Sequence, residues 1–115
     1  MKNLSILNRA IIIIKAKEPF INWLRHLPVP DNGTTLEDIN FDNATYLLPE
    51  YDMDSEREYL LEKYYETIFE DQLAECWKDS THWPNPRTLS IFKEWFDVEF
   101  HSLVLDLVDL PLEKD

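Results

Sequence analysis

Two acidic residues and a histidine alternate near the C-terminus, in residues 97–101. If this segment is a β-strand, Asp97, Glu99 and His101 project from one face, because successive side chains of a strand point to opposite sides. Two carboxylates and an imidazole can bind a divalent metal ion, and His82 could add a further ligand. Such an ion would lower the pKa of a coordinated water and provide the nucleophile of a metal-dependent hydrolase.

The competing interpretation of this segment is structural. Charged side chains on an exposed edge strand discourage pairing with other chains, and the sequence has no His-x-x-x-His, Glu-x-x-His or cysteine pair that would support a metal site. Ser102 adjoins His101, as a nucleophile adjoins its base, but neighbouring side chains in a strand point to opposite faces and would not meet. With Gly33 as the only glycine, no glycine-rich phosphate-binding loop can be built. The sequence therefore favours a protein that is not an enzyme and holds no cofactor, with the hydrolase as the alternative.

A row of glutamates is the most unusual surface feature that the sequence predicts. The row recurs every four residues and consists of Glu58, Glu62, Glu66 and Glu70. Such a face can attract and orient a basic protein or peptide, or it can simply keep an acidic protein in solution. Trp83, next to Pro84, is a candidate apolar anchor for the same partner, unless it packs beneath its own loop.

The overall charge narrows the classes of partner. The chain has 23 acidic and 11 basic residues, a formal net charge of −12, which repels nucleic acid and anionic lipid. No apolar run approaches membrane-spanning length, and no signal-peptide pattern is present. Cys76 is the only cysteine, so an internal disulfide is impossible and a buried, inert thiol is the usual outcome. We expect a cytoplasmic protein that binds neither nucleic acid nor a membrane.

The glutamate row requires a long helix over residues 54–79. Large apolar residues recur every four positions from Leu61 to Trp77, as they do along one side of an α-helix. Ser55 followed by Glu58 has the pattern of a capping box at its start.

The four consecutive isoleucines Ile11–Ile14 predict a stiff, buried strand over residues 10–16. Because this strand has no polar alternation, we expect both of its faces to be covered. If the helices covered only one face, the other would be a homodimer surface. Residues 45–48 predict a second strand. Residues 97–108 favour a third strand, bulged at 101–102, over a continuous helix.

Three further helical segments have recognisable starts. Pro19 opens a short helix, Thr35 caps a single turn, and Asn85 with Pro86 begins the last helix. The predicted architecture is one α+β domain over residues 1–115. A small three-stranded sheet packs in two layers against about three helices, in the order β-α-β-α-α-β, with the isoleucine strand at its centre.

Five motifs extend over most of the chain. They are Pro19-Phe20-x-x-Trp23-Leu24, Tyr46-Leu-Leu-Pro-Glu50, Phe69-Glu70-x-x-Leu73, Trp83-Pro84-x-x-Arg87 and Trp95-Phe-Asp-Val-Glu-Phe-His-Ser102. Together they resemble a family of small acidic bacterial proteins of unknown function. The resemblance implies a bacterial cytoplasmic protein with a compact α+β domain, and it assigns no functional residue.

Overall fold

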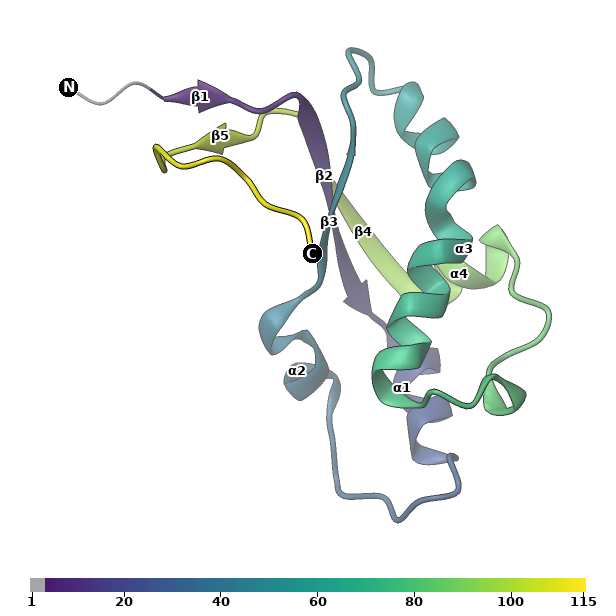
Figure 1. Cartoon of the computed structure of the whole chain (residues 1–115). Coiled ribbons are helices and arrows are strands. Elements are labelled where there is room, and N and C mark those ends of the chain that lie inside the picture. Colours follow the sequence, from purple (N-terminus) through teal and green to yellow (C-terminus); the bar gives the residue numbers. More distant parts are fainter. Residues whose placement is uncertain (1–3) are drawn as a thin grey trace.

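The computed structural model describes residues 4–115 and is built on a three-stranded antiparallel sheet (Figure 1). Strand β2 (Arg9–Ala16) lies between β3 (Thr45–Pro49) and β4 (Phe96–His101). The isoleucine strand is therefore central, as predicted, and the α+β class is confirmed. Residues 96–101 and 105–106 form strands, so the helical alternative for residues 97–108 is wrong and the strand prediction is confirmed in part.

Four α-helices and two short 3₁₀ turns connect the strands of the described residues. They are α1 (Glu18–Arg25), α2 (Leu36–Ile39), η1 (Asn40–Asp42), α3 (Glu56–Cys76), η2 (Ser80–His82) and α4 (Leu89–Trp95). The order around the main sheet is β2-α1-α2-β3-α3-α4-β4. Helix α2 is the single turn predicted at Thr35, which the predicted order of elements did not include. Among residues 4–115, no helix combines the length and the apolar character that crossing a membrane would require.

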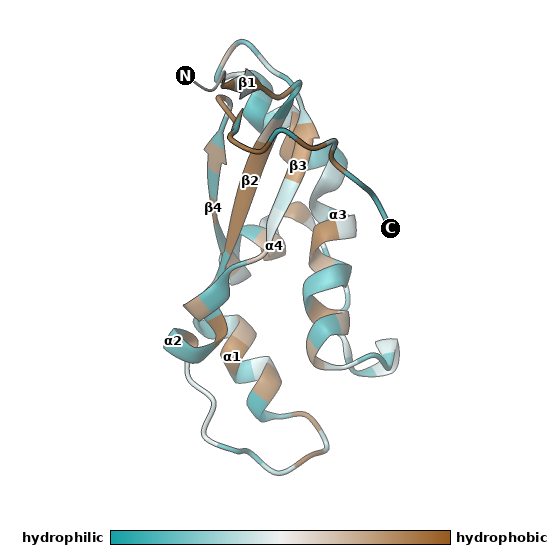
Figure 2. Ribbon diagram, turned by 60° about the vertical axis from the view of Figure 1, so that its left-hand side comes forward, coloured by the Kyte–Doolittle hydropathy of each residue, from teal (hydrophilic) through white to brown (hydrophobic). Residues whose placement is uncertain are grey.

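Within residues 4–115, helices cover only one face of the sheet. Along β2, Ala10, Ile12 and Ile14 are buried, whereas Ile11 and Ile13 on the opposite face stay partly exposed. The buried row joins a cluster with residues of α1, α3 and α4. Figure 2 shows α3 beside the sheet and α1 below its lower end. The prediction that both faces are covered is wrong, because all three helices pack on the same side.

Aromatic side chains fill the space between the sheet and the helices. Phe69 of α3 is fully buried, and its ring centroid lies 5.7 Å from that of Phe92 in α4 and 5.5 Å from that of Phe96 in β4. Phe20 of α1 lies 5.4 Å from Phe96. Tilted and edge-to-face pairs at these distances add about 0.5–1.5 kcal/mol each to the burial of the rings. This aromatic core fixes α3 relative to the sheet.

Two predicted helix starts differ from the structure. Ser55 has helical backbone angles and makes no capping hydrogen bond. The carboxylate of Glu56 instead accepts hydrogen bonds from the backbone N–H groups of Asp52 and Met53, at 2.7 and 2.9 Å. The last helix does not begin at Pro86. Thr88 is extended and caps α4, because its Oγ1 accepts from the N–H of Ile91.

The segments that precede β2 and follow β4 pair with each other beyond the sheet and form a second, two-stranded sheet. After a break at residues 102–104, β5 (Leu105–Asp106) pairs antiparallel with β1 (Ser5–Ile6), and the N–H of Leu7 donates to the carbonyl of Val104 at 2.8 Å. The single bulged strand predicted over residues 97–108 is therefore two strands in different sheets, separated by this break. We call residues 4–8 with 102–106 the arm, and residues 107–112 the tail. Figure 1 shows the arm projecting from the sheet, away from α1 and α3.

Candidate functional site

Ion pairs bind both ends of the glutamate row to neighbouring segments. Glu58 pairs with Lys93 of α4, and Glu70 Oε2 lies 3.2 Å from Arg87 Nη2. Exposed pairs of this kind stabilise a fold by about 0–1 kcal/mol. Their main effect here is to place a basic side chain beside each end of the row.

The middle of the row remains available. Glu62 and Glu66 are exposed, and no basic side chain among residues 4–115 forms an ion pair with either. Lys63, which lies between them in sequence, extends over the ring of Tyr64 at 5.5 Å. Tyr59 is 64% exposed and lines a shallow hollow together with Glu62 and Lys63. Of these two carboxylates, Glu62 therefore adjoins an exposed aromatic ring, with Lys63 in the same hollow.

Trp83 is half-buried and packs against its own loop. Its indole N–H donates to the carbonyl of Trp77 at 2.7 Å, and the guanidinium of Arg87 lies over the ring, 5.5 Å from its centroid. Of the two alternatives open from the sequence, the structure has the packed one, and only part of the ring is left to contact a partner.

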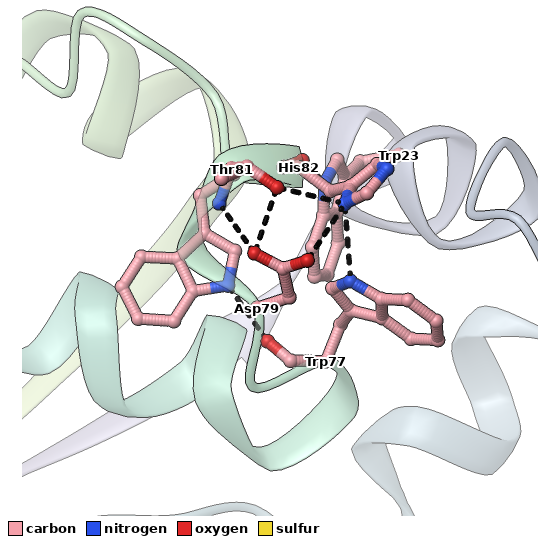
Figure 3. A network of polar contacts seen from close by, with 6 residues as sticks. Trp23, Trp77, Asp79, Thr81 and His82 are labelled. Carbon is pink, nitrogen blue, oxygen red and sulfur yellow. Dashed lines mark hydrogen bonds and ion pairs between the residues drawn. The ribbon is translucent and has the colours of Figure 1, made fainter.

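A network of indole and carboxylate hydrogen bonds holds the loop after α3, as Figure 3 shows. Trp23 donates to the carbonyl of His82 at 2.7 Å, and Trp77 donates to His82 Nδ1 at 3.3 Å. Asp79 accepts from the backbone N–H and the hydroxyl of Thr81. These bonds from Thr81, with a smaller contribution from His82, lower the pKa of Asp79. The imidazole of His82 is thus engaged in holding the loop.

The four residues predicted as metal ligands do not form one cluster. Asp97, Glu99 and His101 do share one exposed face of β4, as expected. Glu99 Oε2 lies 3.4 Å from His101 Nε2, and Asp97 Oδ1 lies 3.9 Å from Lys17 Nζ. His82 belongs to the loop after α3 instead. In the part of the chain that the structure describes, no group of three His, Cys, Asp or Glu side chains could hold a metal ion. No observation therefore favours the hydrolase.

A second acidic site, which the sequence pattern did not indicate, lies where α3 passes η1 and the segment before β3. A hollow of about 380 Å³ is lined there by the carboxylates of Asp42, Asp71 and Glu75. The hydroxyl of Tyr46 donates to Asp71 at 2.5 Å. Burial, and then this bond to Asp71, raise the pKa of Tyr46. The i,i+4 spacing of Asp71 and Glu75 was a possible signal, but Asp42 comes from a distant segment.

Cys76 lines the same hollow and does not supply a reactive group. Burial first, and then the charge of Glu75, raise the pKa of its thiol. Because the thiolate is the nucleophilic form, a raised pKa makes the residue less reactive at neutral pH. This agrees with the inert thiol that the sequence predicts.

Comparisons with family models, curated proteins and solved structures give no match to this chain. The resemblance to a family of small acidic bacterial proteins therefore gains no support from them. The function has to be argued from the acidic surface itself.

Proposed function

We propose that this protein is a non-catalytic interaction protein that binds a basic protein or peptide through α3. The observation that carries the proposal is the pair of exposed carboxylates, Glu62 and Glu66, with no ion-pair partner among residues 4–115. Like charges at i,i+4 destabilise a helix by about 0.2–0.5 kcal/mol. A bound cation removes this repulsion and gains two charge contacts.

The surroundings of Glu62 suit a lysine or arginine side chain. Exposed Tyr59 offers an aromatic ring beside Glu62, and rings of this kind attract cations and cover the aliphatic part of long basic side chains. The ion pairs at either end of the row limit the contact to its centre, which would set the register of a partner. The proposal places the protein in the cytoplasm, where a lone cysteine stays reduced.

Binding of a fluorescent lysine- and arginine-rich peptide, followed by anisotropy at low and high salt, tests the proposal. The critical variant is Glu62→Lys with Glu66→Lys. Its matched control is Glu50→Lys with Glu94→Lys, which changes two exposed acids outside α3 and raises the net charge equally. Exposed charge contacts contribute about 0.2–1 kcal/mol each. Reversing two of them should weaken binding by about 1–2 kcal/mol, or roughly 5- to 30-fold.

At moderate ionic strength the control variant should weaken binding less than about twofold, because Glu50 and Glu94 lie outside the glutamate row and salt screens charges that do not contact the peptide. Equal weakening by both variants would mean that only the net charge attracts the peptide. Absence of binding by the unaltered protein at low salt would reject the proposal. Basic proteins recovered from a lysate at low salt, and lost with the α3 variant only, would then identify the natural partner.

A further inference from the structure

The face of the sheet opposite the helices is apolar at its centre. This surface, which we call the open face, consists of the odd-numbered residues of β2, β3 and β4. The strand register places Ile11 directly beside Leu47 of β3, and Ile13 beside Thr45. Leu47 is 50% exposed, and both isoleucines are partly exposed. Because β2 is the central strand, this apolar row lies in the middle of the sheet, where contact with another surface would remove the most apolar area from water.

The arm and tail add a larger apolar surface to the open face. Eight of the thirteen large apolar side chains that are exposed in the described residues lie there, among them Leu4, Ile6, Leu105 and Leu110, with exposed fractions between 46% and 70%. Figure 2 shows much of this part of the chain in brown, interrupted by paler and teal residues. Two strands of two residues each are too short to be stable alone in water. The arm therefore needs a surface to pack against.

The chain exposes more surface than a compact monomer of its mass. A compact monomer of 13.8 kDa has an accessible surface of about 6,600 Å², whereas this chain has 8337 Å². Its radius of gyration is 16.4 Å, against about 13 Å for a compact domain of this length. The excess is about 1,700 Å² per chain, within the range of about 1,000–2,500 Å² that each subunit buries in an obligate dimer.

Charge indicates that a second copy of this chain is the partner. With a net charge of −12, two copies repel each other over most of their surface. The open face is the exception, because the bases Arg9 and Lys15 balance the acids Asp97 and Glu99. The arm and tail add only two acids to it. This nearly neutral, apolar surface gives a basic partner little to recognise, and two copies can meet there without strong repulsion.

We propose that two copies of this chain form a twofold dimer in which the open faces meet and each arm and tail pack against the other copy. In such a contact the same patch is buried on both subunits. The apolar row of Ile11, Ile13 and Leu47 would form the centre of the interface. The dimer surface is separate from the glutamate row of α3, so it exists independently of any basic partner.

Sedimentation velocity of the full chain, over a concentration series at moderate salt, tests the dimer. The unaltered protein should sediment at about twice the 13.8 kDa of one chain at micromolar concentrations. Leu47→Asp at the centre of the open face and Leu105→Asp in the arm should each raise the dissociation constant more than about tenfold, because each buries a charge in the interface. The matched control is Phe41→Asp, which alters an apolar side chain that is 90% exposed in η1.

Both interface variants leave the aromatic core intact, because the replaced side chains are about half exposed within one chain. Their near-ultraviolet circular dichroism should therefore match that of the unaltered protein and exclude misfolding. A dimer that is lost in both interface variants and retained in Phe41→Asp and in Glu62→Lys with Glu66→Lys supports the proposal. A strict monomer at several hundred micromolar, an open-ended series of oligomers, or a dimer unaffected by both interface variants would overturn it.

Discussion

Replacing Ile12 by alanine should destabilise the protein far more than the same change at Ile13. Ile12 is 1% exposed and belongs to the core, whereas Ile13 lies on the open face and is partly exposed. Truncating a fully buried isoleucine costs about 2–5 kcal/mol, a large part of the about 5–15 kcal/mol that stabilises a domain. At Ile13, part of the side chain already meets water, so we expect a loss of about 1 kcal/mol. Ile12→Asp should abolish cooperative folding, and Ile13→Asp should not.

Urea unfolding followed by tryptophan fluorescence measures both losses. The variants are best made in the Leu105→Asp background and compared at low concentration, so that dimer formation contributes nothing to the stability of Ile13. An unchanged dependence of the free energy on urea would show that the variants alter the native core and not the unfolded chain. Equal losses at Ile12 and Ile13 would refute the assignment of the two faces of β2.

Two further predictions concern polar groups next to the core. Asn40 accepts from the N–H of Ala16 at 2.8 Å and donates to its carbonyl at 2.9 Å, so Asn40→Ala should lower the free energy of unfolding by about 1–3 kcal/mol; a thermal midpoint equal to that of the unaltered protein would contradict this. The raised pKa of Tyr46 means that folding favours its neutral hydroxyl. This stabilisation is complete below the unfolded pKa of about 10 and is lost as pH rises above it. Urea unfolding between about pH 8 and 11 should therefore show a shallower decline for Tyr46→Phe, and parallel declines would refute the role of this hydroxyl.

The sequence correctly predicts the helices, strands and caps that are determined by residues close together in the chain. The isoleucine run forms a strand because β-branched residues favour extended backbone, and it pairs on both edges. The apolar rows of α3 are buried at Leu61, Phe69 and Leu73, as their spacing indicates. Thr35 forms a complete capping box with Asp38, and both of its hydrogen bonds lie within residues 35–38.

The errors arise where distant segments decide the outcome. A run of isoleucines looks the same whether helices cover one face or two, so the open face cannot be read from β2 alone. The pairing of Glu58 with Lys93 joins residues 35 positions apart, and it changes which part of the glutamate row is free. At Ser55 the pattern of a cap was present, but the helical backbone of that residue and the carboxylate of Glu56 produced a different start.

The glutamate row of α3 and the open face of the sheet lie on opposite sides of the molecule, and this arrangement has a functional consequence. The helices pack on one face of the sheet and the open face is the other, so a dimer through the open faces would leave both α3 helices on its outside. Two copies of the glutamate row would then be presented on one particle. Linked sites of this kind can strengthen binding by 10²–10⁴ without any new contact, provided that the partner can reach both. Weak, salt-sensitive contacts at Glu62 and Glu66 would thus suffice to bind a partner that carries two basic segments. The monomeric Leu47→Asp variant should bind such a partner with the same affinity as it binds a peptide that carries one basic segment.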